Sequence, residues 1–125
     1  MYLLDSDVLI WFLRRRREVV DLVEGLSDER LAVSVATRFE VLAGAREREQ
    51  PATQALLDAI VNLPVTAQIA DLAVGFRRRY RRQGQTLQIA DLFIAATAVV
   101  EDLVLITFNR KDFPMPELRI FDIDR

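Results

Sequence analysis

The chain has 125 residues, of which 51% are hydrophobic and 29% are charged, and its formal net charge is −2. That size and composition predict one domain over residues 1–125, large enough to bury its own core. There is no cysteine and no histidine, which excludes disulfides, thiolate catalysis, zinc–thiolate sites and the commonest general base. Any chemistry must therefore use oxygen-bearing side chains.

The apolar segments of the chain do not predict a membrane protein. The N-terminal apolar residues have no basic segment before them, unlike a signal peptide, because the arginines come afterwards. The most apolar later stretch, residues 92–100, is shorter than the roughly 20 residues that a spanning helix needs. We therefore expect a soluble cytoplasmic protein with no membrane partner.

Short apolar runs alternate with amphipathic stretches along the whole chain. Strands or short extended pieces are expected, in chain order, at residues 2–4, 31–33, 63–65, 104–107 and 118–121. Helices are expected between them, at residues 7–24, 37–48, 51–61, 67–82 and 88–100. Gly25 and Gly84 are predicted to end the first and fourth of these helices, and Pro51 to begin the third.

The helix expected over residues 88–100 is apolar on nearly every face and contains four alanines, so we predict that it is the buried central helix. Strands connected through helices imply right-handed crossovers and a parallel sheet. The predicted fold class is therefore α/β, with a parallel sheet of four or five strands flanked by helices.

Acidic or amide side chains lie next to several of the apolar runs, namely Asp5, Glu40, Asp91, Asn109 and Asp112. Side chains just past separate parallel strands meet in the crevice outside the carboxyl ends of those strands. Carboxylates gathered there repel one another unless a cation neutralises them, and ligands that are all hard oxygens favour Mg²⁺ or Mn²⁺. The pattern indicates metal-dependent cleavage of a phosphodiester.

The same acids also have structural interpretations. Residues 5–7 could cap the helix that follows them. Glu40 fits a capping box that begins at Thr37, whereas a cap at Ser34 would leave Glu40 free for another role. Asp91 has apolar neighbours, so its carboxylate must be paired, bound to metal or shifted in pKa, unless it caps its own helix.

Arginine supplies all but one of the 17 basic residues, and most of the arginines fall into two clusters at residues 14–17 and 77–82. Arginine binds phosphate through a planar fork, and Tyr80 in the second cluster could stack on an unpaired base. The alternative is that both clusters are ordinary solvated helix faces.

Four segments, in this order along the chain, resemble the motifs of PIN-domain ribonucleases, specifically the VapC toxins of toxin–antitoxin pairs. They are LDSDVLI at residues 4–10, SVATRFEVLAG at 34–44, IADLFIAATA at 89–98 and LITFNRKDF at 105–113. Each motif is a weak signal alone, whereas four in order across nearly the whole chain are a strong one. The resemblance implies a doubly wound α/β fold.

The resemblance also implies a catalytic site that holds Mg²⁺ or Mn²⁺. The implied metal ligands are Asp5, Glu40 and Asp91, and the implied residues beside them are Ser6 and Thr107. Many family members carry a fourth acid where this chain has Asn109. Here Asn109 could bind a metal-bound water, or Asp112 could supply the missing charge. One tightly held metal is expected in the free protein, because less negative charge holds a second dication less well.

The implied activity is hydrolysis of RNA, typically a structured RNA such as transfer RNA, by a metal-activated water. The residues expected to bind this RNA are Ser6, Arg14, Arg15, Arg78 and Arg110. The implied partners are a second copy of the chain and a VapB-type antitoxin, together forming a heterotetramer or a larger complex.

The C-terminal segment of the antitoxin is expected to lie in a groove near the first helices and to block the site. Trp11 and Phe12 diverge by about 100° on a helix, so one of them could face the antitoxin. Burial of both aromatic rings fits the pattern equally well.

Two other functions fit parts of the sequence. Because Asn109 replaces an acid, the chain could be a PIN-like module that binds RNA or antitoxin without cleavage. The segment Asp5-Ser6-Asp7 also fits a phosphatase of the haloacid-dehalogenase type, although little chain follows Lys111 to supply the paired acids of that family. Metal-dependent cleavage of RNA and hydrolysis of a small phosphomonoester would separate these functions.

Overall fold

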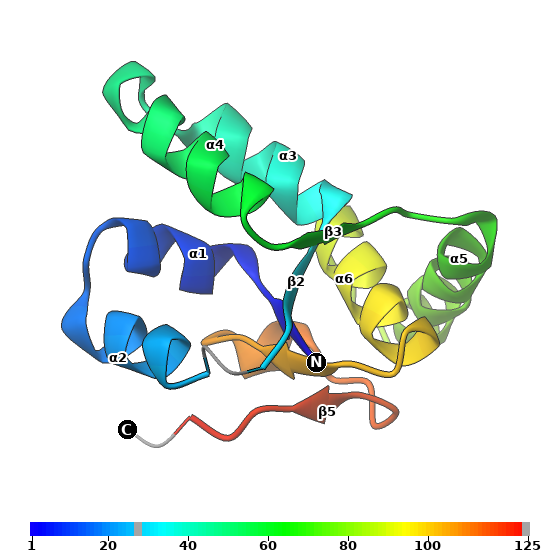
Figure 1. Ribbon diagram of the computed structural model, residues 1–125. Coiled ribbons are helices and arrows are strands. Elements are labelled where there is room, and N and C mark those ends of the chain that lie inside the picture. Colours follow the sequence, from blue (N-terminus) through cyan, green and yellow to red (C-terminus); the bar gives the residue numbers. More distant parts are fainter. Residues whose placement is uncertain (27–28, 124–125) are drawn as a thin grey trace.

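A five-stranded sheet in which every neighbouring pair of strands is parallel organises the chain (Figure 1). The computed structural model describes residues 1–26 and 29–123. The strands are β1 (Tyr2–Leu4), β2 (Leu31–Ser34), β3 (Val61–Leu63), β4 (Val104–Ile106) and β5 (Arg119–Ile120). The helices are α1 (Ser6–Leu13), α2 (Arg17–Gly25), α3 (Val35–Gly44), α4 (Gln50–Asp58), α5 (Ala67–Arg82) and α6 (Ile89–Val100), with short 3₁₀ turns η1 (Glu47–Glu49) and η2 (Arg110–Asp112).

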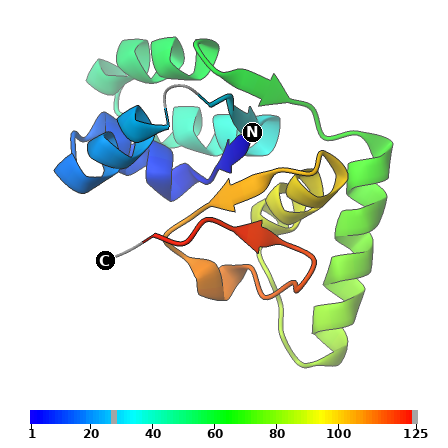
Figure 2. The ribbon, with the colours of Figure 1, turned by 60° about the horizontal axis from the view of Figure 1, so that its bottom comes forward.

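The strand order is β3-β2-β1-β4-β5, so the first strand of the chain lies in the middle of the sheet. The chain builds the sheet outward from β1 through β2 and β3, and then returns to the other side of β1 with β4 and β5. Figure 2 shows β5 in red beside β4 in orange. This reversal of direction beside β1 is the topological switch point at which open α/β sheets place their ligands.

Successive residues of the central strands point to opposite faces of the sheet, because side chains alternate along a strand. Leu3 packs with Leu105 and with the buried face of α5 and α6, including Phe76. Leu4 packs on the other face with Ile106 and with residues from α1 to α4. Figure 1 shows α5 and α6 together at one side and α1 and α2 at the other. The predicted α/β class and the parallel sheet are confirmed.

Helix α5 has the predicted bounds, and α6 differs from its prediction by one residue. The prediction that α6 is a buried central helix is confirmed, since six of its residues are buried: Leu92, Ile94, Ala95, Ala96, Thr97 and Ala98. Its first residue, Ile89, is 62% exposed. Across the described ranges, none of the helices is long and apolar enough to cross a bilayer.

Several predicted boundaries are wrong. The single helix expected over residues 7–24 is two helices, because the chain breaks at Arg15, whose φ is +59°. The helix expected over residues 37–48 starts at Val35, and the Ser34 Oγ atom caps it by accepting the Ala36 N–H at 3.1 Å. Of the two caps that the sequence left open, the structure has Ser34 and not a capping box at Thr37, so Glu40 lies deeper in the helix. That helix also ends at Gly44 and not at residue 48, and α4 ends at Asp58 and not at residue 61. The extended piece expected at residues 63–65 is β3, which begins and ends two residues earlier.

Candidate active site

Asp5 lies at the carboxyl end of β1 and is buried, with 4% of its surface exposed. Its Oδ2 atom accepts a hydrogen bond of 2.7 Å from the Thr107 hydroxyl, and its Oδ1 atom accepts the Ser6 N–H at 2.8 Å. Thr107 follows β4, the strand directly beside β1, which explains how residues so far apart in sequence meet. Burial raises the pKa of Asp5, while the bonds from Thr107 and Ser6 oppose that rise.

Asp7 lies in the first turn of α1, whose N-cap is Asp5, and it also faces the loop that follows β4. Its Oδ1 atom accepts the Val8 N–H at 2.8 Å. Its Oδ2 atom accepts both the Phe108 N–H and the Asn109 side-chain amide, each at 3.0 Å. Burial and the charge of Asp5 raise the pKa of Asp7 to about 6, despite these hydrogen bonds. The sequence left open whether Asp7 caps a helix or faces the site, and in the structure its carboxylate bonds both to the first turn of α1 and to the loop beside Thr107.

Asp91 lies half-buried in the first turn of α6. Its pKa is raised to about 7, first by burial and then by repulsion from four other carboxylates, namely Asp5, Asp112, Glu40 and Asp7. Glu40 is exposed on α3, and its pKa is raised by partial desolvation and by Asp5. The three acids of the expected metal site therefore lie within range of one another's charge.

The two candidates for the fourth ligand differ in what they contact. Asn109 is exposed, its amide donates to Asp7, and its backbone N–H donates to the Thr107 hydroxyl oxygen at 3.0 Å. Asp112 is half-buried in η2, and its charge raises the pKa of both Asp5 and Asp91. Asp112 therefore adds negative charge to the site, whereas the Asn109 side chain is engaged with Asp7.

The site contains five carboxylates, those of Asp5, Asp7, Glu40, Asp91 and Asp112. They suit a hard divalent cation, because all their donor atoms are oxygens and their negative charges repel one another. Among residues 1–26 and 29–123, the four ion pairs leave these five acids without a basic partner. Within the same ranges, however, no group of three or more acids is arranged so that it could hold an ion as it stands. The carboxylates therefore fit a divalent metal by their charge and their oxygen donors, but among the described residues they do not converge closely enough to surround an ion.

The predicted RNA-binding residues lie at different distances from these acids. Arg14 borders a small depression of about 70 Å³ together with Glu40, so it lies at the rim of the site. Arg110, in η2, lines an open pocket of about 550 Å³ together with Thr107 and Asn109. Arg15 lies at the break between α1 and α2, and Arg78 lies on α5, both of them exposed.

Tyr80 cannot stack on a base, because only 5% of its surface is exposed and it packs in the core. The sequence left base stacking open because the run of arginines gave no sign that one position within it faces inward. Arg79 instead covers the Tyr80 and Phe76 rings and forms two hydrogen bonds with Glu117, at 2.8 and 2.6 Å. Arg77 donates to the Leu87 carbonyl at 3.3 Å.

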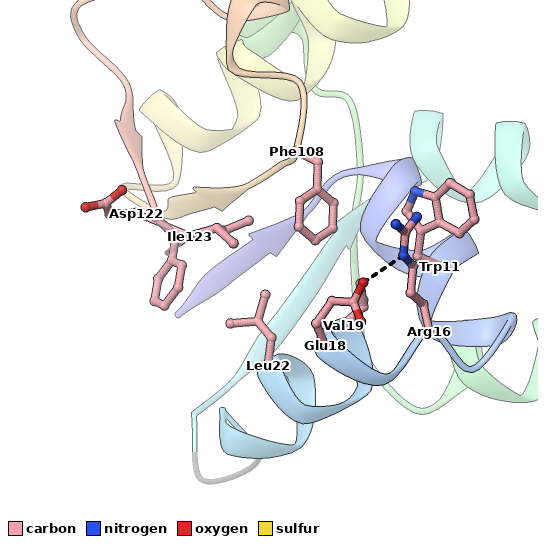
Figure 3. A pocket seen from close by; sticks show the side chains of 9 residues that line it. Trp11, Arg16, Glu18, Val19, Leu22, Phe108, Asp122 and Ile123 are labelled. Carbon is pink, nitrogen blue, oxygen red and sulfur yellow. Dashed lines mark hydrogen bonds and ion pairs between the residues drawn. The ribbon is translucent and has the colours of Figure 1, made fainter. Parts of the chain in front are cut away.

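A groove of about 800 Å³ runs between the first two helices and the end of the chain (Figure 3). Its lining includes Trp11, Arg16, Leu22, Phe108, Phe121 and Ile123. Figure 3 shows the Arg16 guanidinium lying against the Trp11 ring, 4.6 Å from its centroid, with Arg16 also bonded to Glu18 at 2.8 Å. The sequence did not reveal the C-terminal wall of this groove, although Phe121 and Ile123 alternate there with a polar residue.

The PIN domain family model matches residues 2–115 of the chain. Among curated proteins, Ribonuclease VapC19 of Mycobacterium tuberculosis is 38% identical over 122 residues, covering 95% of this chain and 98% of its own length. Ribonuclease VapC10 of the same species is 42% identical over 118 residues, covering 94% and 89%.

The fold matches solved structures of toxin–antitoxin complexes. A chain of the toxin–antitoxin complex from Klebsiella pneumoniae is 30% identical, with a TM-score of 0.81, and the match covers 98% of this chain and all of the other. A chain of VapBC2 from Rickettsia felis, bound to a promoter DNA fragment, is 21% identical, with a TM-score of 0.87 and 98% coverage of both chains. At that lower identity the likeness concerns the fold alone.

Proposed function

This chain belongs to the PIN-domain family, in its VapC group, and we propose that it is a metal-dependent endoribonuclease that acts as a toxin. The observation that carries the proposal is the position of Asp5. It is buried at the switch point of the sheet, bonded to Thr107, and within range of the charges of acids on α1, α3, α6 and η2. A purely structural cluster would pair such buried acids with bases instead.

The residues that would hold Mg²⁺ or Mn²⁺ are Asp5, Glu40 and Asp91, with Asp112 adding negative charge nearby. The bound ion would supply an activated water and neutralise charge on the phosphate. The Thr107 hydroxyl and the Ser6 N–H each bond one oxygen of the Asp5 carboxylate, and together they fix its orientation. Asp91 must lose its proton to act as a ligand, and its raised pKa makes that loss depend on pH near neutrality.

The proposed product ends follow from the absence of histidine. Cleavage through the ribose 2′-hydroxyl needs a general base near neutral pH, and imidazole is the commonest one. Attack by water leaves a 5′-phosphate and a 3′-hydroxyl, and it uses only the oxygen ligands that this chain has. We propose a structured RNA such as transfer RNA as the substrate, cut in a loop whose unpaired bases can be splayed out.

A basic surface on the last turns of α5, made of Arg78, Arg81 and Arg82, supports contact with the RNA backbone. All three are exposed, and they share one helix face because they are three and four residues apart. In the part of the chain that the structure describes, the ion pairs leave these three guanidinium groups free for phosphate. The neighbouring Arg77 and Arg79 are held by Leu87 and Glu117, and therefore have structural roles.

The groove beside Trp11 is the proposed seat of a VapB-type antitoxin segment. Its lining is mostly apolar and aromatic, and it ends at Phe108, which also lines the pocket that holds Thr107 and Asn109. A peptide in this groove would therefore reach the candidate catalytic residues. Phe39 and Ile89, which are 73% and 62% exposed on the contacting helices α3 and α6, support a proposed homodimer that covers them.

The proposed activity is tested with the purified protein and total cellular RNA in Mg²⁺, in Mn²⁺ and in EDTA. Discrete products that need the metal and disappear in both Asp5→Asn and Asp91→Asn variants would support the nuclease. The unclosed ligand shell favours one alternative, a PIN-like module that binds RNA or antitoxin without cleavage. Intact RNA with retained binding would support that alternative. The family match leaves the haloacid-dehalogenase interpretation of Asp5-Ser6-Asp7 without support.

A further inference from the structure

The loop after β4 is fastened to the start of α1 by one carboxylate. Asp7 Oδ2 accepts two hydrogen bonds from this loop, one from the Phe108 N–H and one from the Asn109 side-chain amide. The second oxygen, Oδ1, accepts the Val8 N–H and thereby fixes Asp7 on α1. The contact joins segments about 100 residues apart, and it lies directly beside Asp5 and Thr107.

We propose that Asp7 and Asn109 form a positioning pair that holds Thr107 against Asp5, and that Asn109 is not a metal ligand in this chain. Asn109 is connected to Asp5 by a continuous series of hydrogen bonds. The Asn109 N–H donates to the Thr107 hydroxyl oxygen at 3.0 Å, and that hydroxyl donates in turn to Asp5 at 2.7 Å. The role of the pair in cleavage rests on the proposed function, whereas its role in holding the loop does not.

The pair explains why position 109 is an amide. A carboxylate at 109 would face the Asp7 carboxylate at hydrogen-bond distance, and two like charges there repel each other. An amide instead donates its N–H to Asp7. The opposite orientation of the amide would bring two oxygens together, so the carboxylate of Asp7 also determines which way the Asn109 side chain points.

The two roles for Asn109 make opposite predictions for an Asn109→Asp variant. A metal ligand would gain charge, so Mn²⁺ would bind more tightly and RNA cleavage would be unchanged or faster. A positioning pair would be broken by repulsion, so the loop would loosen and cleavage would fall by roughly tenfold to a hundredfold, as small misplacements of catalytic groups do. Asp7→Asn should loosen the loop as well, because an amide has one accepting oxygen where the carboxylate uses two, one for α1 and one for the loop.

The decisive variant is the exchange Asp7→Asn together with Asn109→Asp. It restores an amide opposite a carboxylate, with the donor now on α1. Its rate of RNA cleavage should be at least tenfold higher than that of Asn109→Asp alone. The matched control is Gln68→Glu, which makes the same amide-to-acid change at an exposed position on α5. The control should cleave RNA as the unmodified protein does.

Amide hydrogen exchange provides a readout that is independent of cleavage. Exchange at the backbone N–H of Asn109 should be roughly tenfold faster in each single variant than in the unmodified protein, and slow again in the exchanged pair. The N–H of Phe108 should stay fast in the exchanged pair, because it donates to Asp7 Oδ2 and an amide nitrogen at that position cannot accept it. If the unmodified protein cleaves no RNA, this exchange pattern still supports the pair while the proposed function fails. Unchanged exchange in Asn109→Asp, tighter Mn²⁺ binding in calorimetry, or cleavage that the variants leave intact would each overturn the proposal.

Discussion

The hydroxyl of Thr107 donates a 2.7 Å hydrogen bond to Asp5, and this bond joins two residues that lie 102 positions apart in the sequence. Thr107→Val keeps the shape of the side chain and removes the donor, which leaves the buried carboxylate with one partner fewer. We expect a loss of about 2 kcal/mol in the free energy of unfolding at pH 7.5. Urea denaturation measures this loss.

Thr107→Ser is the control, because it retains the hydroxyl and removes only a methyl group. It should keep most of the stability and most of the RNA cleavage, whereas Thr107→Val should lower both. Equal stability for the valine and serine variants would show that the hydrogen bond to Asp5 contributes nothing measurable to the fold.

Asp91→Asn should stabilise the protein at high pH while it abolishes cleavage. The pKa of Asp91 is raised to about 7, so the folded state holds the proton more tightly than the unfolded state does. The stabilisation that this proton provides is complete below about pH 4 and is lost as the pH rises through about 7. The asparagine variant is neutral at every pH and escapes the loss. At pH 8 we expect a gain of roughly 1 kcal/mol, after allowance for the half-exposed position of Asp91.

The gain should shrink as the pH falls below 7 and approach zero near pH 4, where Asp91 is protonated in both the folded and the unfolded state, and thermal unfolding at several pH values measures it. Asp71→Asn, at an exposed position on α5, serves as the control and should shift stability little at any pH. A gain of the same size at pH 5 and pH 8 would contradict the assignment of the effect to the Asp91 proton. Added Mg²⁺ should raise the melting temperature of the unmodified protein at pH 8 more than that of Asp91→Asn.

The sequence predicted the sheet well because its strands are apolar runs between helices. Residues 2–4 are a short apolar run, which is typical of a buried strand. The apolar residues of α5 repeat with the period of a helix over its full length, and Gly84 follows its end. The break at Arg15 had no such signal. Its positive φ is held by the packing of α1 against α2, and neither glycine nor proline is present there to mark it.

Arg15→Gly should therefore increase stability. Arginine at a φ of +59° is strained by its Cβ atom, and glycine is not. After subtraction of the extra chain entropy of glycine, we expect a gain of about 0.5 kcal/mol in denaturant unfolding. Arg14→Gly is the matched control, because Arg14 has a φ of −84° and gains nothing from glycine. It should lose about 0.5 to 1 kcal/mol, and a loss of that size at Arg15 too would show that no strain is present.

The basic surface of Arg78, Arg81 and Arg82 should determine how strongly salt weakens RNA binding. Each neutralised phosphate contributes about 0.7 to the slope of log K against log salt concentration for a single strand. Replacing all three arginines by glutamine should lower that slope by roughly 2. Fluorescence anisotropy in EDTA measures binding while the RNA stays intact.

The control for this surface is a triple glutamine variant of Arg30, Arg46 and Arg48, which are also exposed but lie on β2 and η1 or directly beside them. It should leave the slope close to that of the unmodified protein. Equal losses in both triple variants would indicate that net charge alone controls binding, and that α5 has no special part in it.

The candidate acids could be found from the sequence, because each one follows or lies beside an apolar run. Their contacts could not be found in that way. Whether Asp7 caps a helix or faces Asn109 depends on the approach of β4 to β1, which no local pattern records. The inward position of Tyr80 is a similar case. The rotation of α5 against the core decides it, and the surrounding arginines hide it.

The middle position of β1 also affects the order in which the protein can be completed during synthesis. Asp5 is made about 100 residues before its partners, because one neighbour of its strand is β4, and Thr107 and Asn109 come later still. A chain released early therefore carries its acids without the hydroxyl that orients the first of them. If the protein cuts cellular RNA, a copy terminated before β4 is harmless to the cell that makes it, because the hydroxyl that orients Asp5 has not yet been made.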